Sequence, residues 1–313
     1  MFPAKERTAE SSDSGRTVSG MRIFITGASG FIGSHLTKTL TSHELVTVTR
    51  RPLEPQDGLM NIVTELTDDA SLLAAMEGCD AVVHLAAMSS ATAGAVDPVE
   101  CVETNVVATA RLAQLAKISG VGRFVFASTG LVYGQPTVLP ITEQTALDAV
   151  GTYSASKLAA ESMLRVIHPA TAMVRLFNVY GPGQTGTLVP VLIEKLRQGD
   201  QVVLQGDGSQ VRSFLYVADA VEALCSLVDS DITGVLNLAG ERATVLEVYA
   251  AIATALGSSA SPEFSPGRPG DPKENWAVSE RFAKELKWSP RTSLRDGIAM
   301  TVAHASDPSI RHH

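Results

Sequence analysis

Two kinds of apolar pattern alternate along the first half of the chain. Short continuous runs rich in Val, Ile and Phe predict strands, and longer runs with helical spacing separate them. The strand-like runs are 22–26, 45–49, 81–87 and 123–128, and the helical patterns are 31–42, 98–119 and 152–167. Continuous apolar strands alternating with helices indicate a parallel sheet covered on both faces. The pattern predicts an α/β fold with a Rossmann-type doubly wound parallel sheet.

The pattern loosens after residue 175. Gly/Pro-rich loops at 178–187 and 258–272 separate shorter strands and helices. We expect a dinucleotide-binding Rossmann domain over 21–175, which the chain re-enters later, and a smaller C-terminal substrate-binding lobe formed mainly by 176–313. Residues 1–20 are polar and lack the apolar core of a signal peptide, so we expect a disordered extension or an expression remnant there.

Composition narrows the classes of partner. The net charge of −8 and the pI of about 5.4 argue against a nucleic-acid-binding surface. The sequence has no run of 18 apolar residues, so no membrane span is expected. The three cysteines, Cys79, Cys101 and Cys225, are far apart in sequence, which predicts idle thiols in a reducing, cytoplasmic compartment and no metal site.

A glycine-rich turn follows the first predicted strand. In "TGASGFIGSHL" (26–36), Gly27, Gly30 and Gly33 stand three apart between a strand and a helix. Glycine allows a tight turn and a close backbone approach, and the helix N-terminus then offers N–H groups to a pyrophosphate. The spacing in this context predicts dinucleotide binding.

The end of the second predicted strand leaves the choice of dinucleotide open. An acid commonly stands there to hold the adenosine ribose, but this strand ends in "TVTRRP", with Arg50 and Arg51. Guanidinium groups could bind a 2′-phosphate and favour NADP. They could equally form a solvated basic turn over the adenine, compatible with NAD.

Tyr153 and Lys157 form a candidate catalytic pair. They stand four apart in "YSASK" on a predicted helix, and hence on one face. A phenol with a pKa near 10 is a poor base at neutral pH. A neighbouring ammonium and a nicotinamide cation would both favour the phenolate, so we expect the pKa of Tyr153 to be lowered. Tyr153 could then take a proton from a sugar hydroxyl during hydride transfer.

Several motifs in order resemble one family. They are "GASGFIG", "VVHLAA", "TNVVAT", "FASTGLVYG", "YSASK", "RLFNVYGPG", "GDGSQVRSFLYVADA" and "RPGDP". The chain from Met21 to about Ala303 resembles the extended short-chain dehydrogenase/reductases, in their NAD-dependent nucleotide-sugar epimerase/dehydratase branch, of which UDP-galactose 4-epimerase is the best-known member. The resemblance implies bound NAD, or NADP if the arginines select it, and a nucleotide-sugar substrate.

The resemblance also implies roles for individual residues. Thr129 would hydrogen-bond the reacting sugar oxygen with Ser128 beside it, Tyr153 would be the base, and Lys157 would tune it and bind the nicotinamide ribose. The implied cofactor-binding residues are Gly27, Gly30, Phe31, Ile32, Gly33, Arg50, Arg51, Glu65, Leu66, Leu85, Ala86, Ala87, Asn105, Tyr153 and Lys157. The implied substrate-binding residues are Met88, Ser89, Thr129, Asn178, Leu188, Val189, Arg212, Arg268 and Asp271.

Two positions after Thr129 bear on the reaction type. Dehydratases of the family carry Asp-Glu there and decarboxylases carry a Glu nearby, whereas this chain has Gly130 and Leu131. The resemblance therefore implies reversible hydride transfer at one sugar carbon, as in a UDP-hexose 4-epimerase. An NADPH-dependent 4-keto-sugar reductase and a non-catalytic dinucleotide sensor remain as alternatives.

The sugar, the base and the assembly are less well specified. Family members that bind hexuronates commonly have Arg after "YGP", but "YGPGQTGT" contains none, which favours a neutral hexose or N-acetylhexosamine. UDP is the expected base, with dTDP as an alternative. The family commonly forms homodimers through a four-helix bundle, which the helices at 98–119 and 152–167 would supply here.

Overall fold

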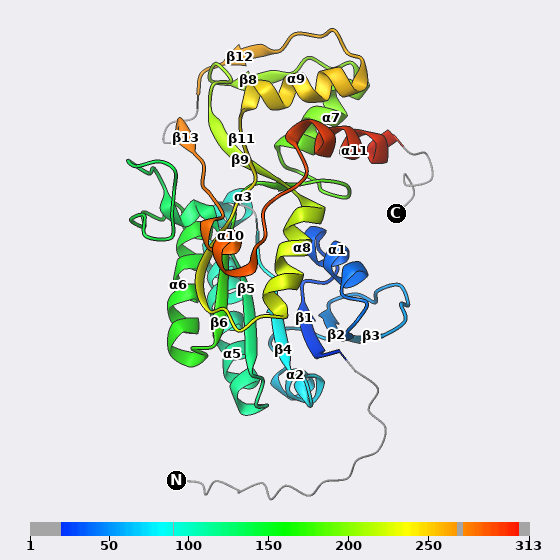
Figure 1. Cartoon of the computed structure of the whole chain (residues 1–313), viewed down its shortest axis with the longest axis vertical. Helices are drawn as coiled ribbons and strands as arrows, with labels where there is room; N and C mark the ends of the chain where they lie inside the picture. Colours follow the sequence, from blue (N-terminus) through cyan, green and yellow to red (C-terminus); the bar gives the residue numbers. More distant parts are fainter. Residues whose placement is uncertain (1–19, 90, 268–271, 307–313) are drawn as a thin grey trace, which may run out of the picture.

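A seven-stranded parallel sheet is the largest element of the computed structural model, which describes residues 20–89, 91–267 and 272–306 (Figure 1). The strand order is β10-β6-β5-β4-β1-β2-β3. The strands are β1 (Arg22–Thr26), β2 (Glu44–Thr49), β3 (Leu59–Val63), β4 (Ala81–His84), β5 (Arg123–Thr129), β6 (Thr171–Leu176) and β10 (Gly234–Leu238). The chain order reverses between β1 and β4, and doubly wound sheets bind ligands at the carboxyl ends of the strands beside such a point.

Helices cover both faces of this sheet. In β1, Ile23 and Ile25 pack on one side and Phe24 on the other, and all three are fully buried. Helices α1 (Phe31–Thr39) and α8 (Val217–Val228) cover the side of Ile23. Helices α2 (Asp69–Met76), α5 (Ala108–Ile118) and α6 (Thr152–Ile167) cover the side of Phe24. Burial on both faces explains why the strands are continuously apolar rather than alternating.

The later part of the chain builds smaller sheets beyond the carboxyl ends of the large sheet, in the upper part of Figure 1. The four-stranded sheet is β7 (Val179–Tyr180), β9 (Val211–Tyr216), β11 (Glu241–Thr244) and β13 (Glu274–Asn275), and the two-stranded one is β8 (Val203–Gln205) and β12 (Glu263–Ser265). The accompanying helices are α7 (Leu188–Gln198), α9 (Val245–Leu256) and α11 (Leu294–Ser306), whereas α10 (Glu280–Leu286) packs beside β10 of the large sheet. Strand β10 comes from this half of the chain and joins the large sheet beside β6.

Two predicted elements have different bounds in the structure. The strand expected over 81–87 ends at His84, because residues 85–88 leave the sheet as a loop. The helix expected over 98–119 is α4 (Pro98–Val102), a π-helical turn η1 (Glu103–Val107) and α5. Turns of π-helix are rare and occur frequently at functional sites. Both differences fall beside the cavity described below.

Two short strands lie within segments that the sequence predicts to be loops. Strand β7 falls inside the loop expected over 178–187, and β12 falls inside the one expected over 258–272. Of the N-terminal segment 1–20, the structure describes only Gly20. Among the described residues, no helix is both long and apolar enough to cross a bilayer. The short elements that complete the chain are α3 (Ala91–Val96) and a 3-10 turn η2 (Gly130–Tyr133).

Candidate active site at the carboxyl edge of the large sheet

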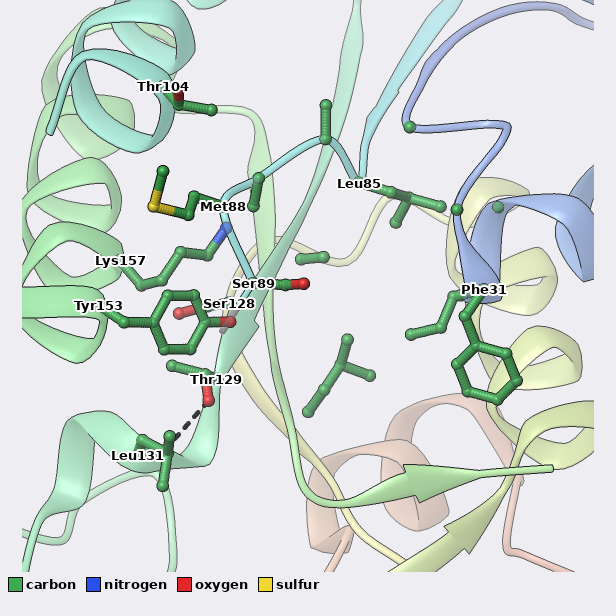
Figure 2. A pocket seen from close by; sticks show the side chains of 18 of the residues that line it. Phe31, Leu85, Met88, Ser89, Thr104, Ser128, Thr129, Leu131, Tyr153 and Lys157 are labelled. Carbon is green, nitrogen blue, oxygen red and sulfur yellow. Dashed lines mark hydrogen bonds between the residues drawn. The ribbon is translucent and has the colours of Figure 1, made fainter. Parts of the chain in front are cut away.

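A cavity of about 1210 Å³ opens at the carboxyl ends of β1, β2, β4, β5 and β6. Loops that follow these strands form its wall together with side chains from α6 (Figure 2). Most of the residues predicted to bind cofactor or substrate line it. They are Gly27, Gly30, Phe31, Ile32, Gly33, Arg50, Glu65, Leu66, Leu85, Ala86, Ala87, Met88, Ser89, Ser128, Thr129, Tyr153, Lys157, Asn178 and Arg212.

Two glycines of the turn after β1 leave no room for a side chain. Gly27 has φ +76°, and a Cβ there would lie 2.6 Å from the backbone nitrogen of Ala86. A Cβ on Gly33 would lie 2.1 Å from the carbonyl oxygen of Gly27. Helix α1 begins after Gly30 without a side-chain cap, so its first N–H groups remain available to an anion. This cradle fits the pyrophosphate of a dinucleotide.

Lys157 supplies a second feature that fits a dinucleotide. Its side chain is 2% exposed, and Nζ lies 4.1 Å from the centroid of the Phe126 ring. Among the described residues, Nζ donates no hydrogen bond, so its N–H groups are available for a ligand hydroxyl. A nicotinamide ribose would provide such acceptors. The residues present therefore fit the group that the sequence implies.

Tyr153, Lys157 and Thr129 converge on one side of the cavity. Figure 2 shows Tyr153 and Lys157 projecting from α6, with the Thr129 hydroxyl beside the phenol. Thr129 ends β5, and its Oγ1 accepts a hydrogen bond from the backbone N–H of Leu131 at 3.2 Å. Tyr153 and Lys157 lie on one face of α6 because they are four residues apart. Thr129 lies beside this face because it ends β5.

Burial dominates the acidity of this pair. It raises the pKa of Tyr153 to about 12, against a smaller lowering effect of the nearby Thr129 hydroxyl. It also lowers the pKa of Lys157 to about 7, although the nearby Glu161 acts in the opposite direction. The sequence led us to expect a lowered pKa for the phenol, but the protein alone gives a raised one because desolvation disfavours the phenolate.

Ser128 is directed toward the protein interior. Its hydroxyl donates to Oε1 of Glu161 at 2.6 Å. Glu161 is fully buried and also accepts two hydrogen bonds from Arg175, at 2.9 Å and 2.6 Å, and one from Arg165 at 3.1 Å. The hydroxyl proton of Ser128 is therefore donated to the buried Glu161–Arg175 ion pair, although Ser128 lines the cavity.

Four predicted site residues do not line the cavity. Asn105 is fully buried, and its Oδ1 accepts from the backbone N–H of Met88 at 2.8 Å, so it contacts the cavity wall from behind. Arg51 accepts a hydrogen bond from Thr49 through its carbonyl oxygen. Leu188 and Val189 begin α7 and pack against the main hydrophobic core.

Two predicted substrate-binding residues, Arg268 and Asp271, lie outside the described residues.

Asn178 lines the cavity while its Nδ2 donates to the carbonyl oxygen of Ser213 at 2.9 Å. Arg212 lines it as well, with Nη1 donating to the carbonyl oxygen of Val211 at 2.8 Å.

The position after Thr129 is closed to side chains. A Cβ on Gly130 would lie 2.5 Å from the ring of Phe177. Phe177 in turn stacks on Tyr133, with ring centroids 6.2 Å apart. Leu131 lines the cavity and carries no ionisable group. The structure thus gives a steric reason for the missing acid at 130.

Other cavity residues were missed in the sequence analysis. Gln135, Val150, Thr187 and Asn275 line the cavity beside predicted residues. Gln135 directly follows "VYG" and Asn275 follows "RPGDP", so proximity to a motif was the available signal. Val150 comes from the segment before α6 and carried no such signal.

Comparison with known proteins places the chain in a family. The family model described as "NAD dependent epimerase/dehydratase family" matches residues 23–239. This chain belongs to that family. UDP-glucose 4-epimerase of Mycolicibacterium smegmatis is 32% identical over 306 residues, covering 90% of this chain and 97% of that protein. UDP-glucuronic acid decarboxylase 1 of Arabidopsis thaliana is 30% identical over 302 residues, covering 90% and 69%.

Solved structures agree with this placement. The Thermus thermophilus UDP-glucose 4-epimerase in complex with NAD has a TM-score of 0.82 and 30% identity, over 91% of this chain and 98% of that one. The relatives in this epimerase/dehydratase family thus include both epimerases and decarboxylases, and the choice between these activities depends on the site.

Proposed function

We propose that this protein is a UDP-hexose 4-epimerase that uses bound NAD. The observation that carries the proposal is the convergence of Thr129, Tyr153 and Lys157 on a cavity that begins at the glycine turn, with no acid at 130 or 131. Elimination of a hydroxyl needs an acid close to the reacting carbon. The closed position at Gly130 therefore favours epimerisation over dehydration.

The chain's own groups would handle the proton of the reaction. When bound, NAD would supply a reversible hydride acceptor for one sugar carbon. Tyr153 Oη would take the proton of the C4 hydroxyl and later return it. Thr129 Oγ1 would hold the same sugar oxygen, and the Lys157 ammonium would stabilise the phenolate. Thr129 and Lys157 are buried at this end of the cavity, so few water molecules would compete for their polar atoms.

The substrate diphosphate has two candidate contacts in the described cavity, Asn178 and Arg212. Arg268 and Asp271 keep their predicted roles in holding the diphosphate and the nucleotide ribose. The cations among the described cavity residues are Arg50, Lys157 and Arg212. With Arg212 assigned to phosphate and Lys157 to the cofactor, this supports a neutral hexose over a hexuronate. UDP is the proposed base and dTDP the alternative.

A reductase is the second candidate, because Arg50 lines the cavity next to Thr49 at the end of β2. A guanidinium there suits the 2′-phosphate of NADPH. Such an enzyme would deliver hydride once to a 4-keto-sugar nucleotide and release its cofactor.

A homodimer and a cytoplasmic location are part of the proposal. Apolar side chains are exposed on the faces of α4, η1 and α6, which supports a helical interface. They are Val99, Val102, Val107, Met163 and Val166. Sedimentation of wild type and of Val166→Lys tests the dimer, since a charge on this face should favour monomers. The three free cysteines support the reducing compartment.

The deciding experiment is incubation with UDP-glucose, UDP-N-acetylglucosamine and UDP-glucuronate, with the C4 configuration of the product determined by NMR. We expect inversion with a neutral hexose and no net consumption of NAD. An absorbance spectrum of the purified protein tests for copurified dinucleotide. Consumption of NADPH with a 4-keto-sugar nucleotide, without C4 inversion of any UDP-sugar, would instead identify the reductase.

A further inference from the structure

A row of buried polar side chains crosses the sheet behind the cavity. Thr26 ends β1, His84 ends β4, and the two are partners in the strand register. Thr109 of α5 covers them, and all three side chains are fully buried. Buried polar groups are costly unless every donor meets an acceptor. Each hydrogen bond in this row therefore has to have a definite direction.

The directions follow from Thr109. Its hydroxyl donates to the carbonyl oxygen of Asn105 at 2.7 Å, so its oxygen must accept the proton from Nε2 of His84, 2.8 Å away. The bare Nδ1 of His84 then accepts from the hydroxyl of Thr26 at 2.6 Å. Thr26 Oγ1 in turn accepts the backbone N–H of Ala86 at 3.3 Å. Burial lowers the pKa of His84 to about 3, so the imidazole stays neutral at physiological pH.

The row continues from Asn105 to the helix that carries Tyr153. Asn105 holds both backbone groups of Met88, accepting at 2.8 Å and donating at 3.2 Å. Its Nδ2 also donates to Ser156 Oγ at 2.9 Å. Ser156 donates to the carbonyl oxygen of Tyr153 at 2.8 Å. We call these residues, Thr26, His84, Thr109, Asn105 and Ser156, the polar row.

We propose that His84 is a positioning residue, which through the polar row holds the loop 85–88 at a fixed distance from the turn of α6 that carries Tyr153. The loop lines one wall of the cavity and Tyr153 another. Hydrogen bonds at Ala86 and at Met88 fix both ends of the loop to the same row. The row passes through η1, whose π-helical turn contains Asn105. This inference rests on the proposed dinucleotide-binding function.

Variants at Thr109 test the row with little change in volume. Thr109→Val removes the hydroxyl that links His84 to Asn105, and Thr109→Ser keeps it. Thr301→Val is the matched control, because Thr301 is also buried and donates to a carbonyl four residues earlier, Gly297, at 2.7 Å in α11. Thr301 does not line the cavity described above.

Variants at His84 separate hydrogen bonding from packing. The carboxamide of His84→Gln offers an acceptor oxygen and an N–H donor, as the neutral imidazole offers one of each, and it adds a second N–H; His84→Leu offers neither. Each protein is stripped of copurified dinucleotide and titrated with NAD by calorimetry, and kcat and KM are measured with the UDP-hexose that wild type epimerises. Thermal melting shows which variants are folded.

We expect Thr109→Val and His84→Leu to weaken NAD binding by about 10-fold, on the scale of an unsatisfied buried polar group. The kcat should fall while KM for the UDP-hexose stays unchanged. Thr109→Ser and His84→Gln should recover much of the affinity, and Thr301→Val should bind NAD as wild type does.

Equal NAD affinity in Thr109→Val and Thr301→Val would overturn the inference. So would a Thr109→Ser protein that binds no better than Thr109→Val. If His84→Leu does not fold, the Thr109 pair decides alone. A wild-type protein that binds no NAD would overturn the proposed function itself, which distinguishes that failure from failure of the row.

Discussion

Ser128 donates a hydrogen bond to the fully buried carboxylate of Glu161, 2.6 Å away. Thr129, the next residue, instead lies beside the phenol of Tyr153 in the cavity. Adjacent residues at the end of a strand point to opposite sides. The two hydroxyls of this segment therefore have different surroundings, one in the buried ion pair and one at the reacting end of the cavity.

This difference predicts opposite phenotypes for two variants. Thr129→Val should lower kcat by about 10²-fold, because it removes a group that acts on the proton in transfer. Ser128→Ala should keep most of kcat but lower the free energy of unfolding by about 1–3 kcal/mol, because the buried carboxylate loses a donor. Steady-state kinetics and urea melts measure the two effects. An equal loss of kcat in both variants would contradict this assignment.

Tyr153→Phe tests the proposed base directly. Removing the phenolic oxygen should lower turnover by about 10²-fold or more, on the magnitude of general acid–base catalysis. Binding of UDP should be spared, since the ring remains in place. Turnover near that of wild type would remove Tyr153 from the mechanism.

Lys157 should make stability depend on pH in the dinucleotide-free protein. Its pKa is about 7 in the folded chain against an ordinary value of 10.5, so between these values the unfolded chain binds more protons. The free energy of unfolding therefore rises with pH through this window, by at most about 1.4 kcal/mol per pH unit. Comparing urea midpoints of wild type and Lys157→Met at the two ends of the window isolates this contribution. Parallel pH profiles for the two proteins would contradict it.

Arg50→Asp tests dinucleotide choice. If Arg50 binds a 2′-phosphate, the variant should shift the ratio of NADP to NAD affinity toward NAD, because a carboxylate repels the phosphate and accepts ribose hydroxyls. Arg51→Asp is the matched control, since Arg51 does not line the cavity. An unchanged ratio in Arg50→Asp means that Arg50 does not bind a 2′-phosphate.

Arg268→Ala is expected to raise KM with little effect on kcat. A contact with the diphosphate stabilises the ground state and the transition state equally. Its loss therefore weakens substrate binding without slowing the chemical step. Steady-state kinetics with the UDP-hexose substrate give both constants. A wild-type KM would remove Arg268 from the site.

The sequence was most informative where one residue type is required at one place. Gly27 and Gly33 could be assigned to the cofactor turn because a side chain at either position meets backbone atoms. Tyr153 and Lys157 could be paired because helical spacing places them on one face. Both features are local, so a pattern in sequence can show them.

Features set by packing between distant segments were harder to predict. The raised pKa of Tyr153 depends on burial by segments far apart in sequence. Strand β3 at the sheet edge is partly exposed and has no continuous apolar run. Val189 was assigned to the substrate on resemblance, but the orientation of α7 places it in the core.

The ring of Phe177 above Gly130 has a consequence for how activities diversify within this fold. The family's dehydratases carry an acid at the position of Gly130. Installing a carboxylate there in this chain would displace an aromatic ring that itself stacks on Tyr133. Evolution of an acid at this position is thus coupled to the placement of Phe177, whose ring has to shift before a side chain at 130 can be accommodated.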